Sequence, residues 1–382
     1  MTATSPSDYG DETVFVYRRR PTPIGGAATL SDITAPAAER GHTPPAETAG
    51  RTLRVALAIV RVGPVAILIV LFAVMTLLSS VFFTERNLQN LVMQTSVIAV
   101  LAVGQLLVIV TRGIDISVGS ILGLSTITGG LAFGTAWGGS AVATILIMAG
   151  TGLAVGAVNG IAYVYGRMPN PLIITLATLG IARGLALIIS GGDSVVGMPG
   201  LVVDLGSGLV GPVPWAGVFL LVVAGAASFL TRQTQWGAWI YAVGGNPEAA
   251  ARVGMPVRRV LVSVYCLSGV CAGLAAVLVA GRTDSGFPQA GQLSELDAIA
   301  AVIIGGASIL GGRGTVSGAV VGAFIIGTIR NGLNLLDVDP NWQLVTVGVV
   351  VALAVELDVI RAALERRFQA VQAGRGSAGA SA

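Results

Sequence analysis

Long apolar runs, separated by short polar segments, are the feature that most constrains this 382-residue chain. About 20 apolar residues cross the hydrocarbon core of a bilayer as a helix. The runs are too long for barrel strands and do not alternate with period two, so we predict helices whose backbone groups bond internally. The fold class is therefore all-α, a polytopic membrane protein with about ten transmembrane helices. The predicted spans cover roughly residues 64–83, 91–110, 115–135, 139–165, 171–190, 214–231, 259–281, 295–310, 314–336 and 341–357.

The positions of the arginines predict the orientation of these spans. All 22 basic residues are arginine, and the chain has no lysine. If the N-terminus lies in the cytoplasm and ten spans alternate, all but four arginines fall on the cytoplasmic side. Of the exceptions, Arg86 and Arg282 lie outside, and Arg183 and Arg330 lie within spans. This positive-inside pattern predicts that both termini are cytoplasmic.

Composition divides the chain into three parts. Residues 1–50 contain six of the 16 prolines and little apolar sequence, which predicts a disordered cytoplasmic tail. Residues 51–360 form the predicted transmembrane domain, including a long cytoplasmic loop at 232–258. Residues 361–382 are predicted to be a cytoplasmic C-terminal tail.

The residues that are missing or rare exclude several classes of function. Without lysine there is no Walker A motif and no Schiff-base lysine. The one histidine, His42, cannot form a metal site with two or three histidines, and a catalytic triad would have to use it. A net charge of +3 is too small to suggest nucleic acid as a partner. We predict no catalytic residue, no metal ligand and no nucleic-acid partner.

Polar residues within or at the ends of the spans are candidates for a translocation path, because polar groups are costly in lipid. Asp115 and Asp297 begin predicted helices, where the helix dipole favours a carboxylate, so a capping role is an equal alternative. Arg183 lies near the middle of its span and could pair with a carboxylate such as Asp115. The candidates for the path are Asp115, Asn159, Arg183, Asp297, Asn331 and Asn334.

The cytoplasmic loop contains the signals of a short helix outside the membrane. Asn246 is a good N-cap, Pro247 suits the first helical position, and Glu248 favours the positive end of the helix. Gly254 can end the helix, and Pro256 prevents its continuation. We predict about two turns, which either dock into a partner's groove or contact only the same chain.

The same loop carries a family resemblance. The stretch 241–252, Tyr-Ala-Val-Gly-Gly-Asn-Pro-Glu-Ala-Ala-Ala-Arg, resembles the cytoplasmic loop of ABC importer permeases of the ribose/xylose/arabinose type. The resemblance runs in order from about residue 64 to 357 and does not cover the first 50 residues. Further matching elements lie at 113–119, 171–184, 295–301, 305–315 and 331–334.

This resemblance implies the role of a transport subunit rather than an enzyme, in the bacterial inner membrane. It implies a second permease subunit, in a homodimer or pseudodimer, a separate ATPase that binds ATP and magnesium, and an extracytoplasmic sugar-binding protein. This chain itself would bind no cofactor and would contact membrane lipid. The residues implied to couple it to the ATPase are Gly245, Asn246, Pro247, Glu248, Ala249 and Arg252.

Two alternatives remain from the sequence. One is an ABC permease for another small polar solute, such as a nucleoside or a furanone-type signal. The other is a secondary carrier or channel that needs no ATPase, although the scarcity of carboxylates at span centres argues against proton coupling. A membrane enzyme is disfavoured because no paired carboxylates lie at one membrane depth.

Overall fold

The structure is a computed structural model that describes residues 63–134, 140–353, 355 and 356. All of these residues belong to one compact unit, 55–382. The two predicted tails and both termini lie outside the described residues. The helices are α2 (Glu85–Val110), α3 (Val118–Phe133), α4 (Ala141–Tyr165), α5 (Pro171–Ser190), α6 (Gly200–Ser207), α7 (Trp215–Gln233), α8 (Gln235–Gly245), α9 (Pro247–Arg252), α10 (Val257–Thr283), α11 (Ser294–Ile304) and α12 (Val316–Leu335), with further helices at Gly63–Leu78 and Pro340–Leu353.

Strands are few and very short among the described residues. β1 (Val195–Val196) pairs antiparallel with β4 (Ser285–Gly286), with Val195 opposite Gly286. β2 (Leu209–Val210) pairs antiparallel with β3 (Val213–Pro214). The fold is therefore helical, as predicted.

Helices occupy every predicted span, but they differ in length. In the described part of the chain, six helices are long and apolar enough to cross a membrane: α2, α4, α5, α7, α10 and α12. The other four predicted spans correspond to shorter helices, namely Gly63–Leu78, α3, α11 and Pro340–Leu353. A polytopic membrane fold is confirmed, whereas the count of ten crossings remains a prediction.

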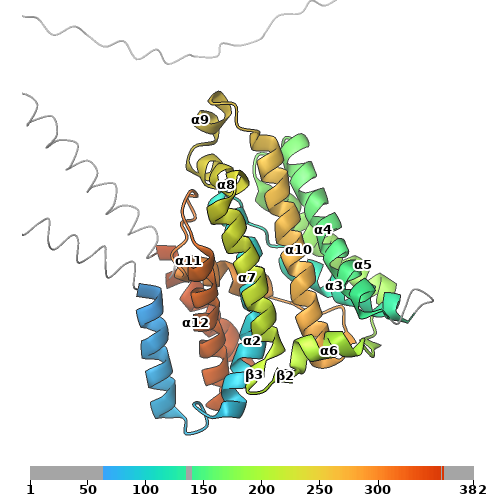
Figure 1. Ribbon diagram of the computed structural model, residues 1–382, viewed down its shortest axis with the longest axis vertical. Coiled ribbons are helices and arrows are strands. Elements are labelled where there is room, and N and C mark those ends of the chain that lie inside the picture. Colours follow the sequence, from blue (N-terminus) through green and yellow to red (C-terminus); the bar gives the residue numbers. More distant parts are fainter. Residues whose placement is uncertain (1–62, 135–139, 354, 357–382) are drawn as a thin grey trace, which may run out of the picture. The chain divides into compact units, whose positions relative to one another are not determined.

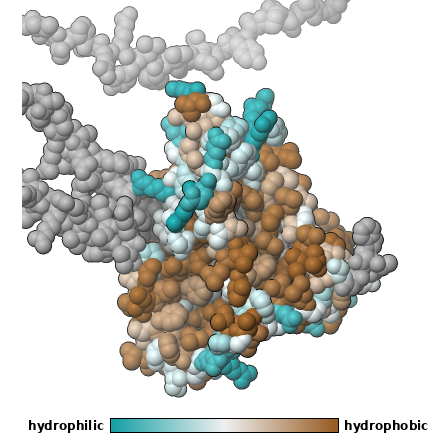
Figure 2. Space-filling model, viewed as in Figure 1, coloured by the Kyte–Doolittle hydropathy of each residue, from teal (hydrophilic) through white to brown (hydrophobic). Residues whose placement is uncertain are grey.

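Two helices form the centre of the bundle. The most apolar window of α2 is 83% buried and that of α10 is 61% buried, against 22% for α4 and 17% for α7. α10 packs against α4, α2, α6 and α3, while α2 also packs against α12, α11 and α7. The outer helices expose apolar side chains, and Figure 2 shows an apolar belt between two more hydrophilic ends. These exposed faces suit contact with lipid.

The helices α3 and α11 begin inside the bundle rather than at its ends. Just before α3, Asp115 accepts a hydrogen bond from Ser268, which lies near the middle of α10. The first turn of α11 packs on that of α3, where a Cβ on Gly119 would overlap Glu295. At 1.5 Å per residue, the 11 residues of α11 span only about 16 Å, roughly half of the hydrocarbon core. α3, with 16 residues, is also shorter than a full crossing, and the N-termini of the two helices meet within the bundle.

A candidate coupling helix and the polar clusters between the helices

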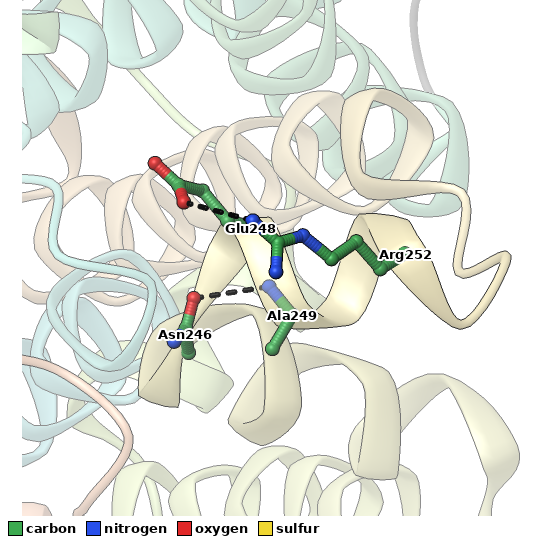
Figure 3. A network of polar contacts seen from close by, with 4 residues as sticks. All are labelled: Asn246, Glu248, Ala249 and Arg252. Atoms are coloured by element: carbon green, nitrogen blue, oxygen red, sulfur yellow. Dashed lines mark hydrogen bonds and ion pairs between the residues drawn. The ribbon is translucent and has the colours of Figure 1, made fainter.

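The helix α9 forms at the predicted place, and its local contacts explain why. Asn246 is the N-cap, and its Oδ1 accepts a hydrogen bond of 3.0 Å from the N–H of Ala249 (Figure 3). Pro247 occupies the first helical position, where its missing N–H costs nothing. Glu248 and Arg252, one turn apart, form an ion pair of 4.0 Å. The sequence prediction of a short helix is confirmed, with the helix ending at Arg252.

α9 presents most of its surface outward. The side chains of Glu248 and Arg252 are 86% and 82% exposed, and Val253 just after the helix is 72% exposed. Ala250 points inward and is buried. Figure 1 shows α9 at one end of the bundle, beyond the end of α10. A charged and partly apolar surface therefore projects from the membrane-spanning helices.

The foot of α9, formed by Gly244 and Gly245 just before it, is fixed to the bundle. Nε of Arg112, just after α2, donates a hydrogen bond of 2.7 Å to the carbonyl of Gly244, and its Nη2 donates to the carbonyl of Gly245. The N–H of Gly312, between α11 and α12, donates to the carbonyl of Val110 at 2.8 Å. These bonds join the end of α2, the end of α8 and the α11–α12 loop at the foot of α9.

The residues Asp115 and Asn159 belong to one buried hydrogen-bond network. Oδ1 of Asp115 accepts from the N–H of Ser117 at 3.0 Å and from its hydroxyl at 2.5 Å, while Oδ2 accepts from Ser268 at 3.1 Å. Asn159 donates to the Ser117 hydroxyl at 2.9 Å and accepts from Thr178 at 2.6 Å. This Asp115 network links α4, α5 and α10 to the start of α3.

A second cluster lies on α11 and α12. Nη2 of Arg330 donates a hydrogen bond of 2.8 Å to Oδ1 of Asp297, and the Asp297 side chain is only 4% exposed. The amides of Asn331 and Asn87 exchange hydrogen bonds of 2.9 and 3.0 Å. These residues hold α11, α12 and α2 together.

Two further candidates for the path lie apart from these clusters. Asn334 is exposed and accepts a hydrogen bond of 2.8 Å from Gln343. Arg183 is half-buried, and its Nη1 donates to the carbonyls of Pro288 and Ala290. Among the described residues Arg183 forms no ion pair with Asp115, and the carboxylate with which it interacts electrostatically is that of Glu295. The six candidates therefore form separate clusters, and the proposal that they line one path is untested.

Two residues that sequence reasoning did not single out have notable positions. The sequence places Arg112 only among the cytoplasmic charges, although it binds the foot of α9. Glu295 begins the matching element at 295–301, and its carboxylate is buried where α3 and α11 meet. A carboxylate at the start of an apolar span was the only available signal for Glu295.

Residues 87–355 match the family described as branched-chain amino acid transport system / permease component. The chain belongs to this family. Among its relatives, the ribose import permease protein of Escherichia coli strain K12 is 39% identical over 301 residues, covering 76% of this chain and 91% of the relative. The D-allose transport system permease protein of the same strain is 38% identical, covering 78% and 90%. The xylose transport system permease protein of Haemophilus influenzae is 32% identical, covering 77% and 94%. No solved structure matches the chain.

Family membership and the helices agree on the class of protein. As a permease component with six helices able to cross a membrane in its described part, this chain is a multi-pass protein of the plasma membrane. The resemblance deduced from the sequence motifs is confirmed, because relatives are named for ribose, allose, arabinose and xylose transport.

Proposed function

We propose that this permease is the membrane-spanning subunit of an ATP-driven importer that carries a monosaccharide, either a pentose or a hexose, into the cytoplasm. The names of the relatives support a sugar, although the family description refers to branched-chain amino acids. The chain itself has no lysine for a Walker A motif, so an ATP-driven role requires a second protein.

The observation that carries this proposal is the geometry of α9. A short helix with an exposed surface can lie in the groove of a partner. Its foot is bound to the end of α2, the most deeply buried of the long helices. Movement of an ATPase against α9 would therefore reach the centre of the bundle directly, which supports alternating access driven from the cytoplasm.

In the proposed assembly this permease contacts three kinds of protein chain and the membrane lipid. Two permease subunits form a homodimer, an ATPase docks on Gly245–Ala249 and Arg252, and an extracytoplasmic protein delivers the sugar from the other side. Lipid surrounds the exposed apolar faces. ATP and magnesium bind to the ATPase, and this chain has no cofactor of its own.

Charge reversal on α9 tests this proposal against a matched position. Glu248→Arg changes an exposed carboxylate on α9, and Glu85→Arg changes an exposed carboxylate in the first turn of α2, at the other end of that helix from Arg112. We expect Glu248→Arg to abolish co-purification of the ATPase and uptake, while Glu85→Arg retains both. Full association and full uptake in Glu248→Arg would contradict the docking of an ATPase on α9.

The solute class needs its own measurement. Binding of ribose, arabinose, xylose, allose and leucine to the partner binding protein, followed by uptake of the bound solutes, separates a sugar from an amino acid. We expect at least one sugar to be taken up and leucine to be excluded. Uptake of leucine, a nucleoside or a furanone-type signal in place of every sugar would retain the ABC permease but replace its substrate.

A further inference from the structure

One face of the first two turns of α3 is covered by two charged side chains from other helices. A Cβ on Gly119 would overlap Oε2 of Glu295, which belongs to α11. A Cβ on Gly123 would lie 2.7 Å from Nη1 of Arg183, which belongs to α5. Gly119 and Gly123 are one helical turn apart and share a face. A carboxylate and a guanidinium therefore converge over adjacent turns of one helix.

The carboxylate of Glu295 is buried with capacity for a further hydrogen bond. The residue is 9% exposed, and its Oε2 has no hydrogen-bond partner within the described ranges. A buried carboxylate oxygen without a donor is costly, so such an atom in a folded protein calls for an explanation. Its position where the N-termini of α3 and α11 meet points to a ligand that supplies the donor.

The guanidinium of Arg183 offers the complementary donors. Its bonds to the carbonyls of Pro288 and Ala290 both come from Nη1, and a guanidinium carries five N–H groups. These bonds hold the arginine against the segment that leads into α11. Arg183 and Glu295 also interact electrostatically. The pair thus presents donors and an acceptor on neighbouring sites.

The first backbone N–H groups of α11 already have acceptors. The N–H groups of Ser294 and Leu296 donate to the carbonyls of Gly291 and Leu293 at 3.0 and 3.1 Å. Leu293 has a φ of 64°, a strained conformation for a branched residue and one that is often found at functional sites.

The outer side of this meeting point is partly exposed. Residues 287–293 are largely non-helical, and Gln292 and Leu296 are exposed beside the buried Glu295. Non-helical backbone at membrane depth is tolerated only against protein or a water-filled cavity, not against lipid. The start of α11 therefore faces a path or the second permease subunit.

We propose that Glu295 and Arg183 contact hydroxyl groups of the transported solute where α3 meets α11. This inference rests on the proposed sugar-import function. A sugar hydroxyl both donates and accepts hydrogen bonds, so a carboxylate beside a guanidinium suits a polyhydroxylated, uncharged solute. Glu295 accepts from a hydroxyl through Oε2, and Arg183 donates to a neighbouring hydroxyl oxygen.

The test couples a change in the protein to a change in the sugar. The complete transporter, with its ATPase and binding protein in proteoliposomes, takes up the best of labelled ribose, arabinose, xylose and allose, and then the monodeoxy analogues of that sugar. For each variant, the ratio of parent to analogue uptake is measured. Discrimination by the binding protein is common to all variants and cancels when these ratios are compared between variants.

The variants are Glu295→Ala, the isosteric Glu295→Gln, and Arg183→Lys, with Glu85→Gln as an exposed control. We expect wild type and Glu85→Gln to favour the parent sugar over one analogue by about tenfold or more, as for a hydrogen bond to a charged group. In Glu295→Ala the hydrogen bond is absent for parent and analogue alike, so this ratio falls towards one for that analogue alone. Glu295→Gln keeps an acceptor oxygen but loses the charge, so it lowers the same ratio only in part. Arg183→Lys, which keeps a cation but loses the planar fork, lowers the ratio for a different analogue.

The possible outcomes distinguish a failure of this inference from a failure of the proposed sugar-import function. If wild type transports a sugar and every ratio is unchanged in both Glu295 variants, Glu295 does not contact the solute and the inference is overturned. Glu295→Gln keeps the size and shape of the side chain, so it remains informative should Glu295→Ala fail to assemble with the ATPase. If wild type transports no pentose and no hexose, the proposed function itself fails.

Discussion

Nε of Arg112 lies 2.7 Å from the carbonyl oxygen of Gly244, and this bond joins the end of α2 to the foot of α9. The same guanidinium donates to the carbonyl of the next residue, Gly245. One arginine thus connects the buried centre of the bundle with the helix that we propose to meet the ATPase. The positions of Arg112 and Gly244 differ by 132 residues, so only the folded chain brings them together.

Removing this connection should impair coupling more than it impairs assembly. In Arg112→Ala, two charge-assisted hydrogen bonds are lost, each worth about 1.5–3 kcal/mol. We expect uptake to fall about tenfold or more, while the ATPase still co-purifies because the surface of α9 is unchanged. Arg86→Ala, an exposed arginine in the first turn of α2, is the control and should transport normally. Normal ATP-driven uptake in Arg112→Ala would contradict a coupling role.

Two adjacent glycines at the end of α8 should respond differently to the same substitution. A Cβ on Gly244 would overlap the carbonyl oxygen of Val110, whereas a Cβ on Gly245 meets nothing within 4 Å. Overpacking costs typically 1–3 kcal/mol, so Gly244→Ala should lower the melting temperature in detergent and weaken ATPase binding. Gly245→Ala should keep the melting temperature of wild type, because its added Cβ meets no other atom of this chain. Equal behaviour of the two variants would show that the contact with α2 is not tight.

The cap of α9 gives a prediction that can be rescued. Asn246→Ala removes the acceptor for the N–H of Ala249 and should destabilise α9 by about 1 kcal/mol. Because α9 has only six residues, this loss should fray its first turn and weaken the affinity for the ATPase several-fold. Asn246→Ser and Asn246→Asp keep a capping oxygen and should restore the affinity. An alanine variant that binds as well as the serine variant would argue that the cap is unimportant.

The sequence predicted α9 well because its signals are local. Asn246 and Pro247 specify the start of the helix through their own chemistry, whatever the rest of the chain does. The apolar runs likewise predicted where helices form, because lipid leaves the backbone no other partner. The contacts that fix α9 were not predictable in this way, since the bond from Arg112 depends on how α2 and α8 pack.

The Asp115 network should contribute mainly to stability. Asp115→Ala leaves the Ser117 and Ser268 hydroxyls without their acceptor, and an unpaired buried group costs about 1–3 kcal/mol. We expect a clearly lower melting temperature in detergent. Asp204→Ala, an exposed aspartate on α6, should leave the melting temperature unchanged. If Asp115→Ala melts like wild type but loses uptake, the aspartate serves the path rather than the fold.

The ion pair between Asp297 and Arg330 should show strong coupling. Asp297→Asn leaves the partly buried guanidinium of Arg330 without its partner, and Arg330→Gln leaves the buried carboxylate of Asp297 without its partner. The double variant removes both charges, so its loss of stability should be smaller than the sum of the two single losses. Melting temperatures of the four proteins complete this cycle. Additive losses would mean that the pair contributes no interaction energy.

The interior of the bundle limited prediction in a different way. Asp115, Arg183 and Asp297 were recognised as costly polar groups, but their partners lie on other helices and cannot be read from spacing. The sequence does not mark Glu295 as a site residue, because its burial results from the packing of the start of α11 against the start of α3. The predicted span at 295–310 is short and contains glycines, which indicates an incomplete crossing, but the sequence does not show at what membrane depth α11 begins.

Uptake of labelled sugar into proteoliposomes tests the central claim most directly. Vesicles containing this permease are compared with and without the ATPase, with binding protein outside the vesicles and ATP on the side of α9. The account predicts uptake only when permease, ATPase, binding protein and ATP are all present, and loss of that uptake in Glu248→Arg but not in Glu85→Arg. Equal uptake without the ATPase, driven by an ion gradient alone, would contradict the account and identify a secondary carrier.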